Sequence, residues 1–203
     1  MAQVFKLDEI LKALKDIDVV DVIAQGFKAL SEEKVVIPPI GEMLFPDVDG
    51  ELHIKYGAIK GDEDFVVKMA TGFFQNPSIG LSPFSGCMMV FSQKTGHISS
   101  VLLEEGELTN HRTAAAGAVA AKCLAPKNVN MIGIVGTGVQ SRLQALYLQK
   151  MTDCRNLVIW GRNKDKAELA AVDMQKMGYE ANVIENLNDL CKVSQIIVTT
   201  TPA

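Results

Sequence analysis

The sequence predicts an α/β protein in two parts, an α+β domain over residues 1–125 and a doubly wound parallel sheet over residues 126–203. Two observations predict this fold class. From residue 128 onward, short apolar runs of strand length alternate with segments of helical periodicity, as in a parallel α/β sheet. Before residue 125, two helical segments come first and several strand-like runs then follow one another, which is typical of an α+β domain.

The elements of the first part follow from hydrophobic spacing and turn residues. Thr109 and Asn110 are suitable N-cap residues for its last helix, and Pro126 stops that helix. We expect helices over residues 7–15, 19–33 and 111–124, strands over residues 34–40, 51–60 and 65–73, and a hairpin of residues 87–92 and 97–103.

The second part contains four strands with helices between them, and Gly178 ends the longest of these helices at its C′ position. A doubly wound sheet of this type has about six strands, so we expect the sheet to be incomplete at its C-terminal end. The expected strands are residues 130–135, 156–160, 180–184 and 195–200, and the expected helices are residues 139–150, 164–177 and 187–192.

The segment from Met131 to Arg142 has the most informative pattern. An apolar strand runs into Gly136-Thr-Gly138 and a helix follows at once. The two glycines allow a tight turn and a close approach of the backbone to a pyrophosphate at the helix N-terminus. Ser141 replaces the third glycine of the G-x-G-x-x-G pattern. In its strand–turn–helix context the pattern predicts a Rossmann-type dinucleotide site, and the alternative is a tight turn in an unrelated α/β domain.

The end of the second strand of this part bears on the choice of dinucleotide. NAD-selective folds usually have an acidic residue there, which accepts a hydrogen bond from the ribose 2′-hydroxyl, whereas an arginine accommodates a 2′-phosphate. This chain has Arg162-Asn163-Lys164 and no acidic residue before Asp165. Arg162 and Asn163 are therefore candidate cofactor residues, and the pattern favours NADP(H) over NAD(H). The alternative is that Arg162 and Lys164 are solvated charges at the start of a helix.

Composition excludes several classes of partner. A formal net charge of −4 gives no electrostatic basis for binding nucleic acid or a membrane surface. No apolar run has the length of a bilayer span, and the first residues lack a secretory apolar region. The four cysteines are widely spaced, so we expect reduced thiols in a cytoplasmic protein and no metal site.

Three segments give the chain a specific resemblance to a known family. They are Lys68-Met-Ala-Thr-Gly-Phe-Phe-Gln-Asn-Pro77, Leu108-Thr-Asn-His-Arg-Thr-Ala-Ala-Ala-Gly117 and Ile132-Gly-Ile-Val-Gly-Thr-Gly-Val-Gln140. With these segments the chain resembles the ornithine cyclodeaminase/μ-crystallin family over essentially its whole length. The resemblance implies a homodimer with a substrate-binding, dimerising domain and a Rossmann domain.

The resemblance also implies NAD(P)-dependent hydride transfer at the Cα of a small amino or imino acid. One form is the cyclodeamination of ornithine to proline and ammonia. The alternatives are an NADPH-dependent ketimine or imino-acid reductase, an amino-acid dehydrogenase, and a non-catalytic ligand-binding protein of the μ-crystallin type.

Two residues take catalytic and substrate-binding roles by this resemblance. Lys68 corresponds to the family lysine over the substrate carboxylate, and Arg112 to the arginine that grips this carboxylate beside the nicotinamide. A guanidinium gives a two-point hold that orients Cα–H. Arg112 is also expected in the first turn of its helix, where the helix dipole adds attraction for an anion. Arg112 is thus counted among the cofactor-binding residues as well, which further comprise Thr113, Gly136, Gly138, Val139, Gln140, Thr199 and Thr200.

The chain also departs from the family pattern. Ornithine cyclodeaminases have a further arginine for the carboxylate early in the chain, but no arginine precedes Arg112 here. Lys55 is the candidate substitute, and Glu42 is a candidate for holding a substrate amine. Strand alternation places His53 and Lys55 on one face, and we interpret His111 as an incidental helix residue. The catalytic aspartate of the family falls beyond residue 203.

Overall fold

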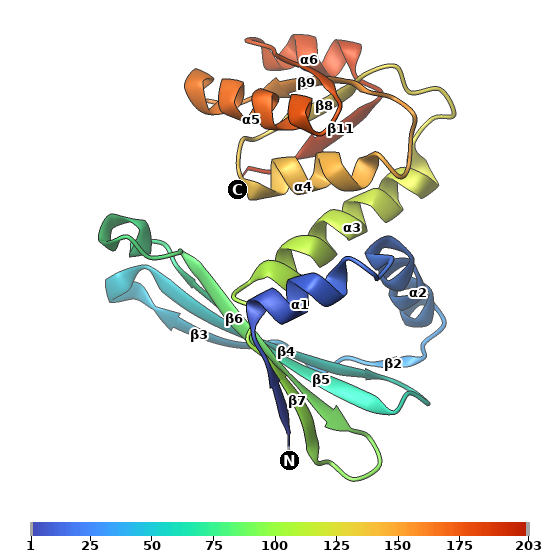
Figure 1. Cartoon of the computed structure of the whole chain (residues 1–203), viewed down its shortest axis with the longest axis vertical. Helices are drawn as coiled ribbons and strands as arrows, with labels where there is room; N and C mark the ends of the chain where they lie inside the picture. Colours follow the sequence, from blue (N-terminus) through green and yellow to red (C-terminus); the bar gives the residue numbers. More distant parts are fainter. Residues whose placement is uncertain (1, 202–203) are drawn as a thin grey trace. The chain divides into compact units, whose positions relative to one another are not determined.

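The computed structural model describes residues 2–201, which form two compact units (Figure 1). The described residues of unit 1 are 2–18 and 25–109, and those of unit 2 are 19–24 and 110–201. Two helices, α2 (Val19–Ser31) and α3 (Glu107–Leu124), have residues in both units. The mixed α/β fold class with a Rossmann-type parallel sheet is confirmed.

Unit 1 contains the whole of helix α1 (Leu7–Leu14) and a mixed sheet, besides its parts of α2 and α3. The strand order is β1-β7-β6-β5-β4-β2, and β3 also pairs with β4. The neighbouring strands from β4 to β7 are antiparallel, whereas β1 is parallel to β7. The strands are β1 (Gln3–Phe5), β2 (Val35–Val36), β3 (Gly41–Phe45), β4 (Gly50–Ile59), β5 (Asp64–Phe73), β6 (Phe84–Ser92) and β7 (Ile98–Leu102), with short 3-10 helices at Pro46–Val48 and Asn76–Ile79.

Unit 2 contains a four-stranded parallel sheet of order β10-β9-β8-β11. The chain enters at β8, winds to β10 in one direction and then places β11 on the other side of β8. This reversal is the topological switch point at which doubly wound sheets bind ligands. The elements are β8 (Ile132–Val135), α4 (Val139–Leu148), β9 (Asn156–Trp160), α5 (Lys164–Lys176), β10 (Glu180–Val183), α6 (Leu187–Val193) and β11 (Ile196–Thr199).

The core of unit 2 is a cluster of buried apolar side chains on the sheet and its helices. Ile132, Ile134, Leu148 and Leu157 have no exposed surface. Tyr179 belongs to this core, where its hydroxyl donates to the carbonyl of Ala145 at 2.8 Å. Burial raises the pKa of this hydroxyl to about 12, since ionisation would place a charge in the core. None of the described helices is long and apolar enough to cross a membrane.

Most predicted elements occur in the structure, with ends shifted by a few residues. The predicted strand 34–40 is wrong in part, because only Val35–Val36 pairs and Pro38 and Pro39 interrupt the ladder. The strands β1 and β3 were not predicted. The predicted start of the third helix at His111 is also wrong, because α3 begins at Glu107.

The early start of α3 has a local cause. Glu105 and Gly106 adopt left-handed conformations, with φ of 53° and 90°, and turn the chain after β7. The turn brings the carboxylate of Glu104 to the helix start, where it accepts a hydrogen bond from the Leu108 backbone N–H at 2.8 Å. Arg112 therefore lies in the second turn of α3. The expected support from the first-turn dipole does not apply to it.

Candidate dinucleotide and substrate-binding site

The glycine loop of unit 2 has the backbone geometry that its sequence predicts. Gly136 follows β8 with a φ of +126°, a conformation that residues with a Cβ rarely adopt. A Cβ at this position would also lie 2.9 Å from the carbonyl oxygen of Thr200. The Gly136 N–H donates to the carbonyl of Trp160 at 2.8 Å. The loop is thereby held at the carboxyl ends of β8, β9 and β11.

The N-terminus of α4 is open to an anion. Gly138 is the N-cap residue, has no side-chain capping bond, and would bear a Cβ with no atom within 4 Å. Val139, the first helical residue, is half exposed. Uncapped N–H groups at such a terminus are suited to a phosphate. The glycine loop and the helix start therefore fit a dinucleotide pyrophosphate.

Arg142 stabilises this loop through hydrogen bonds to its backbone. Its guanidinium Nη1 donates to the carbonyls of Thr137 and Gly138 at 2.8 and 3.2 Å, and its Nε donates to Asp173 on α5 at 2.8 Å. The hydrogen bond from Arg142, together with a second one from Lys176, lowers the pKa of the Asp173 carboxyl. The ion pair ties the loop to the helix that follows β9. Sequence reasoning did not identify Arg142.

Other candidate cofactor residues lie at the same edge of the parallel sheet. Thr199 ends β11, and the Thr200 backbone N–H donates to the Val135 carbonyl at 2.7 Å. Arg162 follows β9 and is exposed. Asn163 has a structural role, because its side-chain oxygen accepts from the Lys166 N–H at 2.9 Å and caps α5.

In unit 1, the strand register brings Lys55 and Lys68 together. Lys55 on β4 lies directly opposite Lys68 on β5, so both side chains project from one face of the sheet, which we call the lysine face. Lys68 donates a hydrogen bond to the hydroxyl of Thr109 in the first turn of α3. Like charges directly opposite each other on a sheet repel, so an anion bound between these two lysines would relieve the repulsion.

The lysine face also carries a histidine between two carboxylates. His53 projects from the same face as Lys55, as the strand alternation predicted. Its Nδ1 lies 3.8 Å from an oxygen of Glu42, and its Nε2 lies 3.4 Å from an oxygen of Glu51. Glu42, the candidate for holding an amine, is therefore placed near His53 and exposed to solvent.

Arg112 is exposed on α3, three residues after Thr109. Residues with this spacing lie on the same side of a helix, one turn apart. Glu104, which sequence reasoning missed, is fully buried. One of its carboxylate oxygens receives the Leu108 N–H, and the other has no hydrogen-bond partner among the described residues. No sequence signal identifies Glu104, because its burial results from the turn before α3.

Gln140 and Thr113, two other predicted cofactor residues, take part in the contact between α3 and α4. The side-chain amide of Gln140 donates to Asn110, and the Thr113 carbonyl accepts from Gln144. His111 is not an incidental residue, because its Nδ1 lies 2.8 Å from the hydroxyl of Tyr147.

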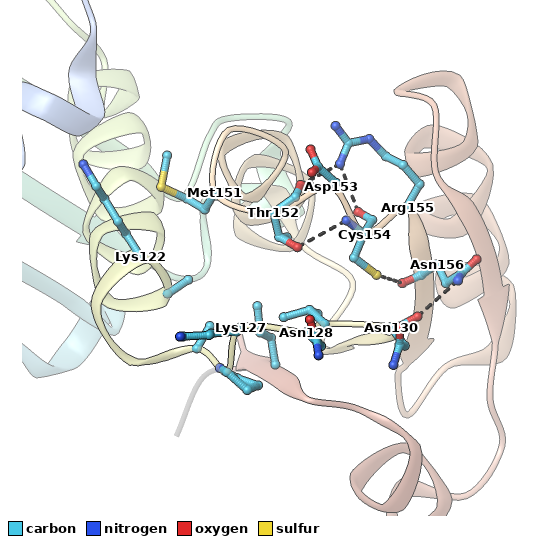
Figure 2. Close-up of a pocket in the computed structure, with 15 residues that line it drawn as sticks. Lys122, Lys127, Asn128, Asn130, Met151, Thr152, Asp153, Cys154, Arg155 and Asn156 are labelled. Atoms are coloured by element: carbon cyan, nitrogen blue, oxygen red, sulfur yellow. Dashed lines mark hydrogen bonds between the residues drawn. The ribbon is translucent and has the colours of Figure 1, made fainter.

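A separate cleft of about 750 Å³ lies at the opposite edge of the parallel sheet (Figure 2). It is lined by residues at the amino ends of the strands, such as Asn130, Asn156 and Ile196. Arg155 also lines it, but its guanidinium donates to the carbonyls of Thr152 and Cys154. Ligands of doubly wound sheets bind at the carboxyl ends of the strands, so this cleft is not the predicted site.

A family model described as the ornithine cyclodeaminase/mu-crystallin family matches residues 2–203. The chain belongs to this family. Among the curated relatives, a putative dehydrogenase of Rhizobium meliloti is 38% identical over 189 residues, with 93% of this chain and 57% of the relative covered. A Delta(1)-pyrroline-2-carboxylate reductase of Bacillus cereus is 32% identical, with 92% of this chain and 57% of the relative covered.

The fold of the chain is similar to those of solved amino-acid and imino-acid oxidoreductases. The Delta(1)-pyrroline-2-carboxylate reductase of Thermococcus litoralis, in complex with NADH and L-proline, matches with a TM-score of 0.88 at 24% identity. The match covers 97% of this chain and 61% of that structure. The chain thus spans less than two thirds of the length of these relatives. Members of the family include reductases of imino acids and cyclodeaminases of amino acids.

Proposed function

We propose that the protein transfers a hydride between a nicotinamide dinucleotide and the Cα of a small cyclic imino or amino acid. The observation that carries the proposal is the uncapped N-terminus of α4 directly after Gly136-Thr-Gly138, which suits a pyrophosphate. The relatives named as pyrroline-2-carboxylate reductases support the substrate class.

Cationic side chains would orient the substrate. Arg112 would hold the α-carboxylate through two parallel hydrogen bonds, and Lys68 and Lys55 would add positive charge. A carboxylate held at two points cannot rotate, so Cα keeps one face toward the hydride donor. In the reductive direction the hydride adds to Cα, the C=N π pair moves to nitrogen, and nitrogen takes up one proton from water. The dinucleotide supplies the hydride when it is bound.

We further infer a preference for NADP(H) from Arg162. This exposed arginine follows β9, where a guanidinium can form charge-assisted hydrogen bonds to a 2′-phosphate. The Thermococcus litoralis reductase is in complex with NADH. This similarity supports a nicotinamide dinucleotide as the cofactor, and the preference for its phosphorylated form rests on Arg162.

Reduction of an imino acid is favoured over cyclodeamination of ornithine. No arginine precedes Arg112, whereas ornithine cyclodeaminases use one there, and Arg162 suits NADPH. The relatives named as reductases are 29–32% identical over about nine tenths of the chain. The ornithine cyclodeaminases are 29% identical over 78% of the chain, but a relative named as an uncharacterized cyclodeaminase is 39% identical over 93% of it, so the preference rests on the two arginine positions.

We also propose a homodimer formed through the sheet of unit 1. Leu52, Ile54, Tyr56, Val67 and Met69 project from the face opposite to the lysine face, and we call this side the apolar face. Phe65 and Phe91 stack there with ring centroids 5.0 Å apart. In residues 2–18 and 25–109, Ile10 is the only buried apolar side chain. The side chains of the apolar face are thus only partly covered within one chain, and apolar surface left partly exposed is typical of an interface.

Product analysis tests the proposed reaction. The full-length protein is incubated with Δ1-pyrroline-2-carboxylate and NADPH or NADH, and separately with L-ornithine and NAD⁺. We expect proline and one equivalent of oxidised dinucleotide in the first reaction. Proline and ammonia from ornithine without net NADH would instead identify a cyclodeaminase. Binding of a dinucleotide without turnover of any imino or amino acid would support a ligand-binding protein.

A further inference from the structure

Two glutamines on one face of α4 hold the turn of α3 that carries Arg112. Gln140 Nε2 donates to the backbone carbonyl of Asn110 at 3.1 Å and lies 3.3 Å from its side-chain oxygen. One turn further, Gln144 Nε2 donates to the carbonyl of Thr113 at 3.3 Å. The two bonds fall on either side of Arg112 in the sequence, so the backbone of this turn is held at both ends.

The side chain of Gln144 occupies a space that only glycine leaves open. Gln144 is 6% exposed, and a Cβ at position 117 of α3 would overlap its amide oxygen. This oxygen has no hydrogen-bond partner among the described residues. Any side chain at position 117 would require the Gln144 amide to shift. Gly117 and Gln144 therefore fix the spacing of α3 and α4.

Tyr147, three residues after Gln144 on α4, makes a further contact with α3. Its hydroxyl lies 2.8 Å from Nδ1 of His111, and the two rings meet edge to face at 5.9 Å. Positions 140, 144 and 147 lie on one face of a helix. The N-terminus of this helix is the proposed pyrophosphate site, so one rigid element joins that site to the turn of Arg112.

We propose that Gln144, packed against Gly117, is a positioning residue that couples dinucleotide binding to the orientation of Arg112. A ligand at the N-terminus of α4 restrains this helix, and Gln144 passes the restraint to Thr113, the residue after Arg112. By linkage, each ligand then increases the affinity of the other. This inference rests on the proposed function, because it needs a dinucleotide at the glycine loop and a carboxylate at Arg112.

Two variants and a matched control test the coupling. Gln144→Met has a similar length and lacks both hydrogen-bonding groups, and Gly117→Ala displaces the amide while Gln144 remains. Gln149→Met is the control. Gln149 follows α4 and its Nε2 donates to the Met177 carbonyl at 2.7 Å, so it makes the same kind of bond to a residue outside α3.

The first readout is hydrogen exchange of residues 108–116, with and without the dinucleotide that the wild type binds more tightly, NADPH or NADH. We expect the dinucleotide to slow this exchange in the wild type and in Gln149→Met, but not in Gln144→Met or Gly117→Ala. The second readout is the Kd of L-proline. The dinucleotide should tighten it about fivefold or more in the wild type and less than about twofold in the two variants. The Kd of the dinucleotide alone should change less than about twofold.

Equal protection of residues 108–116 in the wild type and in Gln144→Met would overturn the inference, as would an equal loss in Gln149→Met. Failure of the proposed function gives results that differ from failure of the coupling. A wild type that binds no dinucleotide would remove both the function and the coupling. A wild type that binds a dinucleotide but reduces no imino acid would remove the function alone, and hydrogen exchange would still decide the coupling.

Discussion

At the scale of single residues, the proposed chemistry depends most on Arg112. Replacing it with methionine keeps much of its length and removes the two-point hold on the carboxylate. We expect kcat/KM for the imino acid to fall by about 100-fold, because a charge-assisted bidentate contact is lost. The Kd of the dinucleotide should change less than about twofold. Lys122→Met, which removes an exposed cation from the same helix, is the control and should retain activity.

Arg162 is the residue that sets the proposed choice of dinucleotide. Arg162→Asp replaces a phosphate-binding guanidinium with a repelling carboxylate. We expect the Kd of NADPH to rise by about 10- to 100-fold and that of NADH by less than about threefold. Binding can be followed by the fluorescence of the reduced nicotinamide. Lys166→Asp makes the same charge change on α5 and should leave the ratio of the two Kd values near that of the wild type. Equal losses for both dinucleotides in Arg162→Asp would refute this role.

At the scale of elements, the turn before α3 determines where this helix begins. Glu104→Ala removes the buried carboxylate that accepts the Leu108 N–H. The free energy of unfolding should fall by about 1–2 kcal/mol, the usual contribution of a helix cap. Urea denaturation measures it. Glu105→Asn is the control, since it removes a neighbouring exposed carboxylate and retains a residue that tolerates a φ of 53°. A similar loss in both variants would contradict the capping role.

The elements that the sequence predicted correctly are those whose signals are local. Helical periodicity and alternating apolar runs predicted α1, α2, β4 and β5. The glycine loop was also predictable, because Gly136 and Gly138 lie in the order strand, turn, helix. By contrast, β1 has three residues, too few for a period to show, and it pairs with a strand far along the chain.

The candidate site was predictable only in part for the same reason. Motif resemblance identified Lys68 and Arg112, and strand alternation placed His53 with Lys55. The pairing of Lys55 with Lys68 depends on the register of β4 and β5, which the sequence alone does not specify. Glu104 and Gln144 were missed because each acts through a contact that exists only after folding.

At the scale of the whole molecule, the proposed homodimer depends on which face of β5 a residue occupies. Val67→Glu places a charge on the apolar face, whereas Val66→Glu places it on the lysine face, one residue away. We expect Val67→Glu to be monomeric, because burying an unpaired carboxylate in an interface is costly. Val66→Glu should remain dimeric. Light scattering coupled to size-exclusion chromatography gives both masses, and circular dichroism checks that both variants are folded.

The central claim is that a hydride reaches the Cα of a small imino acid. The most direct measurement uses NADPH, or NADH, deuterated at C4 of the nicotinamide on the transferred face, with Δ1-pyrroline-2-carboxylate as substrate. The proline formed by the full-length protein is then analysed by mass spectrometry and NMR. We predict one deuterium, located at Cα. Proline without deuterium, or no proline while the dinucleotide is bound, would contradict the claim.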